Sequence, residues 1–393
     1  MKRKLCIGLA AVTAAMMLLT GCGSSSSSNT VTSTATSEAA VAQTAKELVE
    51  EASDGETSEI AASDSSTDES GVDMATEVDE HPENKLGRKI KVGYDIYYLG
   101  NSWSVQLYQE FKWNAENEYA DDIDVTYVQS DNDSNKQIAN LEDLIAQGVD
   151  VIITTPIDAT ALNATLQDAM DEGIKVILLA ATIDGDSYDT MINVKETDFG
   201  AKGAQWLADQ LDGKGNIIML NGISGYTSNE QRREGAEAIF AKYPEINILA
   251  EEDAGWDYAT AKTVVADLLA TYPNIDGVWS QGGAMTLGAI EAFQAANREL
   301  VPMTGEDNNG YLKAVIKNKM EGIGVAKPTW LTRVAINSAI KLMNGETVEK
   351  DDIFPVMTIT TEEMPDYVHE KLSDDVWCGT EMPEDVLAKI FSN

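Results

Sequence analysis

Apolar residues beyond residue 87 fall into short runs, each followed by a longer segment with helical spacing. KIKVGYDI and VDVIITTP have the length of strands and are rich in β-branched residues. SVQLYQEFKWNAENEY and NKQIANLEDLIAQG carry apolar residues three or four positions apart. This alternation predicts β-α-β units, and therefore parallel sheets that are covered by helices on both faces.

The same rhythm restarts with KGAQWLADQL and continues through NIIMLNG, INILAEED and DGVWSQ. Roughly 300 residues follow Gly87, which suits two lobes of ordinary domain size better than one small core. We therefore predict an α/β fold with two doubly wound parallel-sheet lobes.

The N-terminus has the pattern of an export signal. Lys2, Arg3 and Lys4 precede roughly 15 mostly apolar residues, fewer than the roughly 20 that span a bilayer. The following Leu19-Thr20-Gly21-Cys22 resembles the bacterial lipobox, in which the cysteine is acylated. The alternative is an ordinary signal peptide that happens to contain a cysteine. We expect residues 1–21 to be a lipoprotein signal peptide and Cys22 to anchor the protein to the outer face of the cell membrane.

Residues 22–87 are rich in Ser, Thr, Ala, Asp and Glu, a composition that cannot bury enough apolar surface to offset chain entropy. We expect a disordered tether. The chain has a formal net charge of -38, which repels nucleic acid and anionic lipid head groups. Cys6 leaves with the signal and Cys22 carries lipid, so Cys378 has no partner for an intramolecular disulfide.

Catalytic motifs are missing from the sequence. It contains no G-x-S-x-G elbow, no Walker loop and no dinucleotide fingerprint. His81 and His369 are the only histidines and lie far apart in the chain, so no histidine-based acid-base or zinc cluster forms. We expect a protein that is not an enzyme and uses no cofactor or metal.

A calcium loop is the metal site that comes nearest to a match. Asp131, Asp133, Asn135 and Glu142 occupy positions one, three, five and twelve of such a loop. Position six, which needs glycine for a sharp turn, is Lys136. A helix that starts at Ser134, preceded by a polar turn, is the interpretation we prefer.

Lys89 to about Pro355 resembles the ribose-binding-protein-like group of periplasmic binding proteins, the type I solute receptors of ABC transporters. The stretches that carry the resemblance occur in the expected order: GNSWSVQ, QIANLEDLIAQGVDVIITTPIDATAL, GISG with RREGAEA, YPNIDGVWSQGGAMTLGAIEA and GEDNNG. The resemblance implies two lobes joined by a three-crossover hinge, which close over a ligand.

The resemblance also implies where the chain changes lobes. We expect the crossovers near Asn193 to Lys195, Ile323 to Pro328 and Phe354 to Met357. The N-terminal lobe would then comprise residues 88–194 and 328–356, and the C-terminal lobe residues 195–327. Residues 357–393 would be an extension packed on the lobes, for which the sequence suggests no function.

Ligands of open α/β sheets bind beyond the carboxyl ends of the strands, so the residues that directly follow each strand are the candidates for the site. Aromatic faces and scattered hydrogen-bonding groups there suit a polyhydroxy ligand. The candidate ligand-binding residues are Asn101, Trp103, Ser104, Thr155, Glu230, Arg232, Trp256, Gln281, Asp307 and Lys327.

Several candidates have structural alternatives. Trp103 and Trp256 could fill the core, although the resemblance implies that they stack on the ligand. Asp307 matches the ligand-binding aspartate of the family but could instead cap a helix, and Asn101 could cap the helix that begins at Ser102.

Some positions depart from the ribose-receptor pattern. Ala180 and Ala181 stand where those receptors carry an Asp-Arg pair, Gly282 stands where they carry an asparagine, and Glu230 aligns with their arginine, with Arg232 nearby. Each lost hydrogen-bond partner of a buried hydroxyl costs roughly 1 to 3 kcal/mol. Ribose binding in the usual manner is therefore disfavoured. A bulkier, less hydroxylated or cationic molecule is compatible with the small residues there and with Glu230, Glu306 and Asp307.

From these observations we expect a lipid-anchored, monomeric solute receptor that delivers a small carbohydrate or polyol to an ABC permease. The alternative is an extracytoplasmic sensor that presents an autoinducer-like or other non-sugar ligand to a membrane kinase. An enzyme is the least favoured class.

Overall fold

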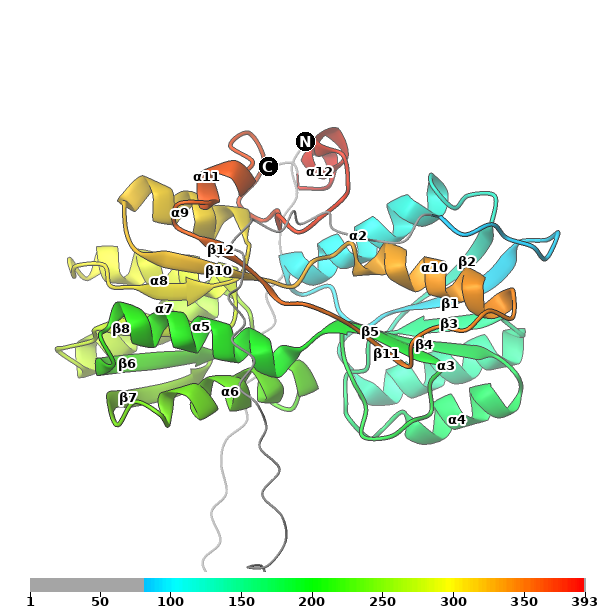
Figure 1. The fold of residues 1–393 in the computed structure, drawn as a ribbon, viewed down its shortest axis with the longest axis horizontal. Coiled ribbons are helices and arrows are strands. Elements are labelled where there is room, and N and C mark those ends of the chain that lie inside the picture. The colour runs from blue at the N-terminus through cyan, green and yellow to red at the C-terminus, as the bar shows by residue number, and fades with distance from the viewer. Residues whose placement is uncertain (1–80, 392–393) are drawn as a thin grey trace, which may run out of the picture. The chain divides into compact units, whose positions relative to one another are not determined.

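A computed structural model describes residues 81–391. The expected signal peptide, Cys22 and the tether up to residue 80 lie outside these residues. Within the described part, the chain forms two six-stranded sheets with helices on both faces (Figure 1). None of the helices between residues 81 and 391 combines the length and apolar character needed to cross a membrane.

The sheet of the N-terminal lobe has the order β11-β5-β4-β3-β1-β2, and all its neighbouring strands are parallel. Its strands are β1 (Ile90–Ile96), β2 (Ile123–Gln129), β3 (Val151–Thr154), β4 (Lys175–Leu179), β5 (Thr190–Val194) and β11 (Asp351–Phe354). Its helices are α2 (Ser102–Glu116), α3 (Ser134–Gln147), α4 (Asn163–Asp171) and α10 (Leu331–Met343).

Both faces of this sheet are buried. Ile177 of β4 belongs to the core beneath α2 and α10, whereas its neighbours Val176 and Leu178 belong to the core beneath α3 and α4. Successive side chains of a strand point to opposite faces, so a sheet covered on both sides needs the continuous apolar runs seen in the sequence.

The sheet of the C-terminal lobe has the order β12-β10-β9-β8-β6-β7. Its strands are β6 (Lys214–Asn221), β7 (Glu245–Asp253), β8 (Gly277–Ser280), β9 (Met303–Gly305), β10 (Gly322–Ala326) and β12 (Met357–Thr360). Its helices are α5 (Glu196–Gln210), α6 (Thr227–Phe240), α7 (Tyr258–Thr271), α8 (Gly283–Ala295) and α9 (Asn309–Asn318).

Here too the two faces form separate cores. Ile217 and Met219 of β6 pack with α5 and α6, and Ile218 and Leu220 pack with α7, α8 and α9. The α/β fold with two doubly wound lobes is confirmed. The edge strand β12 is antiparallel to β10, which adds one antiparallel pair to an otherwise parallel sheet.

Three short segments carry the chain between the sheets: Lys195 after β5, residues 327–330 after β10, and residues 355–356 after β11. The second lies slightly later than the sequence predicted. Ile323 to Ala326 pair within the sheet with β12, and β9 pairs on the other side, so these residues belong to the lobe rather than to the hinge.

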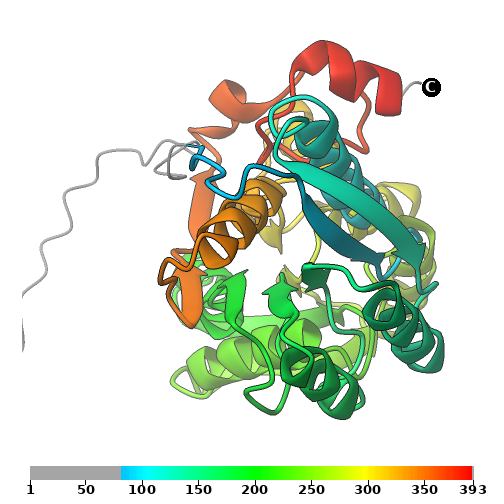
Figure 2. The same ribbon diagram turned by 90° about the vertical axis from the view of Figure 1, so that its right-hand side faces the viewer.

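The end of the chain passes between the lobes once more. After α11 (Met364–Tyr367), the chain bonds to α9, where Asn309 Nδ2 donates to the His369 carbonyl oxygen at 3.0 Å. The final helix, α12 (Glu384–Ile390), packs Val386 and Ile390 near Trp113 of α2 in the other lobe. Figures 1 and 2 show this segment in red.

Candidate ligand-binding site

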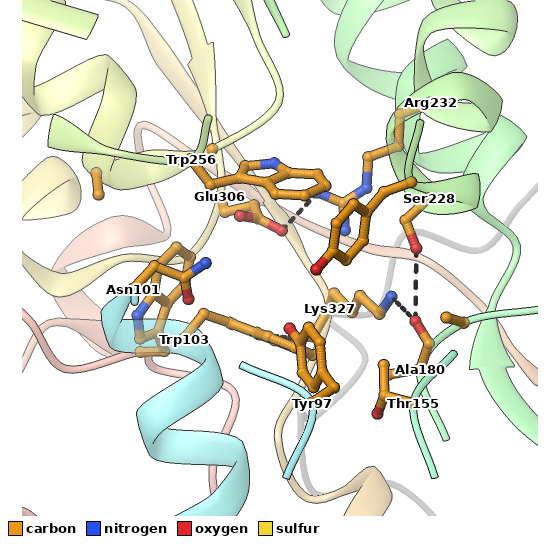
Figure 3. Close-up of a pocket in the computed structure, with 15 residues that line it drawn as sticks. Tyr97, Asn101, Trp103, Thr155, Ala180, Ser228, Arg232, Trp256, Glu306 and Lys327 are labelled. Carbon is orange, nitrogen blue, oxygen red and sulfur yellow. Dashed lines mark hydrogen bonds and ion pairs between the residues drawn. The ribbon is translucent and has the colours of Figure 1, made fainter. Parts of the chain in front are cut away.

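A cavity with about 560 Å³ of empty space, its mouth included, lies between the two lobes (Figure 3). The wall combines five aromatic residues with polar and very small ones: Tyr97, Asn101, Trp103, Thr155, Ala180, Ala181, Tyr226, Ser228, Arg232, Trp256, Gly282, Ala284, Glu306, Lys327 and Trp377.

The turn between β1 and α2 forms the wall of the N-terminal lobe. Asn101 begins the helix, because its side-chain oxygen accepts the Ser104 backbone N–H at 2.8 Å. The same residue lines the cavity, so the cap and the cavity contact occur together. Trp103, in the first turn of α2, donates its indole N–H to the Lys327 carbonyl oxygen at 2.9 Å. That bond fixes the indole between α2 and the second crossover.

Trp256 supplies the aromatic face of the C-terminal lobe. Its backbone has a φ of 53°, and its ring meets that of Tyr226 edge-on at 5.9 Å. Two glycines make room for the indole: a Cβ at Gly222 would lie 2.2 Å from the ring, and a Cβ at Gly282 would lie 3.0 Å from it. Gly282 is therefore explained by packing, because a larger residue there would displace Trp256.

The Trp256 indole N–H has no hydrogen-bond partner among the described residues, although it is buried. An unpaired buried donor is costly unless something else accepts its hydrogen. Since the indole lines the cavity, a ligand oxygen is a suitable acceptor.

Four charged side chains form a buried network at one end of the cavity. Arg232 donates from Nε to Glu196 at 2.7 Å and from Nη1 to Glu306 at 2.8 Å. The Lys327 ammonium pairs with the other oxygen of Glu196. Arg232 also lies over the Phe199 ring at 3.6 Å. Two cations and two carboxylates leave the network without net charge, so it offers hydrogen-bonding groups without a strong field.

Burial shifts the pKa values of this network in directions that its ion pairs oppose. Loss of hydration lowers the pKa of Lys327 and raises the pKa of Glu306. Burial alone would also raise the pKa of Glu196, but Arg232 and Lys327 outweigh it and hold that pKa below its usual value. Each charge of the network thus has a partner of opposite sign within it.

Ala180, the first residue of the Ala180-Ala181 pair, contributes its backbone oxygen to this network. The Ala180 carbonyl oxygen accepts from Lys327 Nζ at 2.5 Å and from the Ser228 hydroxyl at 3.5 Å. Ala180 has a φ of 62°, a left-handed conformation that non-glycine residues adopt at a cost. Where the resemblance implies an Asp-Arg pair, this chain thus has a backbone acceptor and open space.

Six of the ten sequence-derived candidates line the cavity: Asn101, Trp103, Thr155, Arg232, Trp256 and Lys327. They come from the turn after β1, the end of β3, α6, the turn after β7 and the second crossover. The rule that ligand residues follow the strands therefore places most of them together.

The other four candidates do not line this cavity. Ser104 is buried beneath it, and its hydroxyl lies 2.7 Å from the Tyr97 hydroxyl. Gln281 is buried and donates to Asn221 at 3.1 Å, which holds the ends of β6 and β8 together.

Asp307 and Glu230 also make contacts elsewhere. Asp307 accepts the Gly379 backbone N–H at 2.6 Å, and Glu230 lines a separate surface hollow with Arg233 and Glu251. Glu306, the third acidic residue, is paired with Arg232. None of the three therefore offers an unpaired carboxylate in the cavity to a cationic ligand.

Several residues of the cavity wall and of its charged network were not among the candidates. Glu196 directly follows the first crossover, and the rule that selected the others could have found it. Ser228 and Ala284 lie in the first turns of α6 and α8. Trp377 comes from the C-terminal extension, and no pattern in the sequence links it to the cavity.

The structure disfavours the calcium loop. Asp133 caps α3, accepting the backbone N–H groups of Asn135 at 2.9 Å and Lys136 at 3.1 Å, and the Lys136 ammonium pairs with Asp131 at 2.5 Å. A cation already occupies the position where calcium would bind. Within residues 81–391, no group of three or more His, Cys, Asp or Glu residues is arranged to hold a metal.

A profile of the periplasmic binding protein domain matches residues 92–347, which include most of both lobes. The chain belongs to the periplasmic binding protein family. This is a family of extracytoplasmic substrate-binding proteins, which are not enzymes. The match ends before β11, so β11, β12 and the rest of the C-terminal segment lie beyond it.

Known relatives include proteins named for sugars and polyols. The chain is 31% identical over 245 residues to a xylitol-binding protein of Mycolicibacterium smegmatis, covering 62% of this chain and 70% of that protein. It is 24% identical over 270 residues to the ribose import binding protein of Bacillus subtilis, covering 68% and 87%.

A solved solute-binding protein of Bacillus halodurans, with bound myo-inositol, superposes with a TM-score of 0.66 at 25% identity, covering 71% of this chain and 97% of that one. A solute-binding protein of Actinobacillus succinogenes, with bound D-allose, gives a TM-score of 0.62 at 26% identity, covering 71% and 100%. Both neighbours share the two-lobed fold of type I periplasmic binding proteins with this chain.

Proposed function

We propose that the protein captures a small uncharged carbohydrate or polyol between its lobes and delivers it to an ABC permease. The observation that carries this proposal is the cavity between Trp103 and Trp256, which come from opposite lobes. Aromatic faces pack on the C–H groups of a polyhydroxy ligand, while Asn101, Arg232 and Lys327 offer groups for its hydroxyls.

A ligand without charge fits this cavity best. The four-charge network is already balanced, so a charged ligand would leave an unpaired charge in a buried site. The two alanines and Gly282 favour a polyol that does not depend on the groups that ribose receptors place there. The named ligands of the relatives, which include xylitol, ribose and myo-inositol, belong to the same chemical class.

A thermal-shift screen of sugars, polyols, nucleosides and amines tests the ligand class. We expect at least one polyol or sugar to raise the melting temperature, because binding to the folded state stabilises it. A shift with an amine and with no carbohydrate would refute the polyol assignment.

Transport distinguishes the importer from the sensor. Cells should lose uptake of the radiolabelled stabilising compound when this gene is deleted and regain it with the intact gene. Unchanged uptake, together with a lost transcriptional response to the compound, would support the sensor instead.

The lipid anchor is part of the proposal and rests on Leu19-Thr20-Gly21-Cys22. In cells fed an alkyne fatty acid, the wild-type protein should become labelled at Cys22 and should be found in the membrane fraction. A Cys22→Ser variant should carry no label and should be absent from the membrane fraction. Equal membrane association of the variant would contradict the anchor.

We expect the protein to act as a monomer, with sedimentation velocity as the check.

A further inference from the structure

The segment Val376–Glu381, here named the strap, runs between the two lobes beyond the matched family domain. Its first half is bonded to the C-terminal lobe. Asn309 donates its backbone N–H to the Val376 carbonyl oxygen at 2.8 Å, and Cys378 donates its own to the Asp307 carbonyl oxygen at 3.0 Å. These bonds fix the strap to the turn between β9 and α9.

The strap is also bonded to α2 in the N-terminal lobe. Gln106 makes two bonds with the Trp377 backbone: its amide accepts the Trp377 N–H and donates to the Trp377 carbonyl oxygen, both at 2.9 Å. One turn further along α2, the buried Glu110 accepts the Thr380 hydroxyl at 2.7 Å and the Glu381 N–H at 2.8 Å. Residues four positions apart on a helix lie on the same face, so α2 presents both to the strap.

Gly379 lies where the strap meets the hinge. Its N–H bonds to Asp307 at 2.6 Å, and its carbonyl oxygen accepts the backbone N–H of Thr329, in the second crossover, at 2.7 Å. A Cβ at position 379 would lie 2.9 Å from Pro328 Cα and 2.9 Å from Asp307 Oδ2. Only glycine lets the strap approach the crossover this closely.

Trp377 links the strap to the cavity. Its side chain is part of the cavity wall, and its indole N–H donates to the Ser102 hydroxyl at 3.0 Å. The residue is 4% exposed, and both lobes hold it: it bonds to α2 and forms a β-bridge with Asn308.

We propose that the strap is a fourth connection between the lobes and that it places Trp377 against the ligand. A rotation that opens the lobes must break the bonds of the strap to α2 or its bonds to the turn after β9, because the same six residues hold both. The part of the inference that concerns the ligand rests on the proposed function; the part that concerns the lobes does not.

The first test measures the distance between the lobes without any ligand. Spin labels are attached at Glu172→Cys and Lys242→Cys, exposed positions of the N- and C-terminal lobes, in the full chain with Cys6 and Cys22 replaced by serine. Cys378 is buried. With the strap intact, double electron–electron resonance between the two spin labels should give one narrow distance distribution. Gly379→Ala should broaden this distribution and extend it to longer distances.

Gly203→Ala is the matched control, because a Cβ there meets its neighbours at ordinary distances of 3.4 Å or more. It should leave the distribution unchanged. Identical distributions in wild type and Gly379→Ala, or a broad distribution in both, would overturn the connection between the lobes.

The second test measures affinity by calorimetry with xylitol, D-ribose and myo-inositol as probes. For any probe that binds, Trp377→Ala and Gly379→Ala should weaken binding tenfold or more, and Trp377→Phe should weaken it less, because a flat ring remains. Unchanged affinity in Trp377→Ala would overturn the role of Trp377 at the ligand. If neither these probes nor any sugar or polyol of the thermal-shift screen binds, the proposed function fails, while the distance measurement still decides whether the strap connects the lobes.

Discussion

The N-terminal lobe meets the cavity with neutral side chains, whereas the C-terminal lobe brings buried charges to it. Asn101 and Trp103 are held by a helix cap and one cross-lobe hydrogen bond. Arg232 and Glu306, in contrast, depend on each other and on Glu196 at the hinge. The neutral wall can lose a residue without leaving a charge unpaired, and the charged wall cannot. Substitutions of neutral wall residues should therefore affect affinity, and substitutions in the charged network should affect stability.

The largest expected effect is on the charged side. Arg232→Met leaves Glu196 with Lys327 alone and Glu306 without its cation, so the free energy of unfolding should fall by about 3–5 kcal/mol. Urea denaturation measures the change. Arg233→Met, at the next position of α6, removes an arginine that is 40% exposed and should cost less than about 1 kcal/mol. Equal costs for the two variants would show that burial of the network is unimportant.

On the neutral side, Trp103→Ala should weaken ligand binding by about 100-fold, since a large apolar contact is lost. The fold should persist, as judged by circular dichroism, because Trp103 is only partly buried and belongs to no ion pair of the charged network. Trp206→Ala, which removes a partly buried tryptophan away from the cavity, serves as the control. If Trp103→Ala bound the ligand as tightly as wild type, the neutral wall would have no role in recognition.

Each lobe contributes one buried carboxyl to the strap, and burial raises the pKa of both Glu110 and Asp307 to about 7. In the unfolded chain these groups titrate near pH 4, so between about pH 4 and 7 the folded protein holds protons that the unfolded chain has released. Their contribution to stability is therefore complete at low pH and is lost as the pH rises to about 7.

Glu110→Gln should remove one half of this pH dependence. When the pH rises from 5.5 to 8, the free energy of unfolding should fall in both proteins, and the fall should be about 2 kcal/mol smaller in the variant than in wild type. Asp307 continues to titrate in the variant, so a residual slope remains. Parallel curves for wild type and variant would mean that Glu110 titrates outside this range.

The smallest expected effect separates two tryptophans that both have a buried indole N–H without a partner among the described residues. Trp256→Phe should lower affinity about tenfold, because a ligand oxygen loses its donor. Trp330→Phe, which changes a residue of the second crossover away from the cavity wall, should leave affinity unchanged. A similar loss in both variants would point to a general effect on lobe closure rather than a bond to the ligand.

Much of the fold could be predicted from the sequence, because two periodicities carry the information. Strands buried on both faces need continuous apolar runs, and the helices between them show their own spacing, so the two lobes were predictable. The antiparallel β12 was not, since a short edge strand after a crossover has the same composition in either direction.

The site was predictable to the extent that it depends on position along the strands. Asn101, Trp103 and Thr155 follow strands and reach the cavity, as the rule requires. Asp307 also follows a strand, yet its carboxylate turns to Gly379, a residue 72 positions later. Partners that far apart in the chain leave no local pattern, and the same reason kept Trp377 out of the prediction.

A crystal structure of the protein grown with the polyol that gives the largest thermal shift tests the central claim most directly. We predict density for one ligand molecule between Trp103 and Trp256, with a ligand oxygen within 3.2 Å of the Trp256 indole nitrogen as an ordinary hydrogen bond requires. Ligand density at any other place, with the cavity between the lobes filled only by water, would contradict the account.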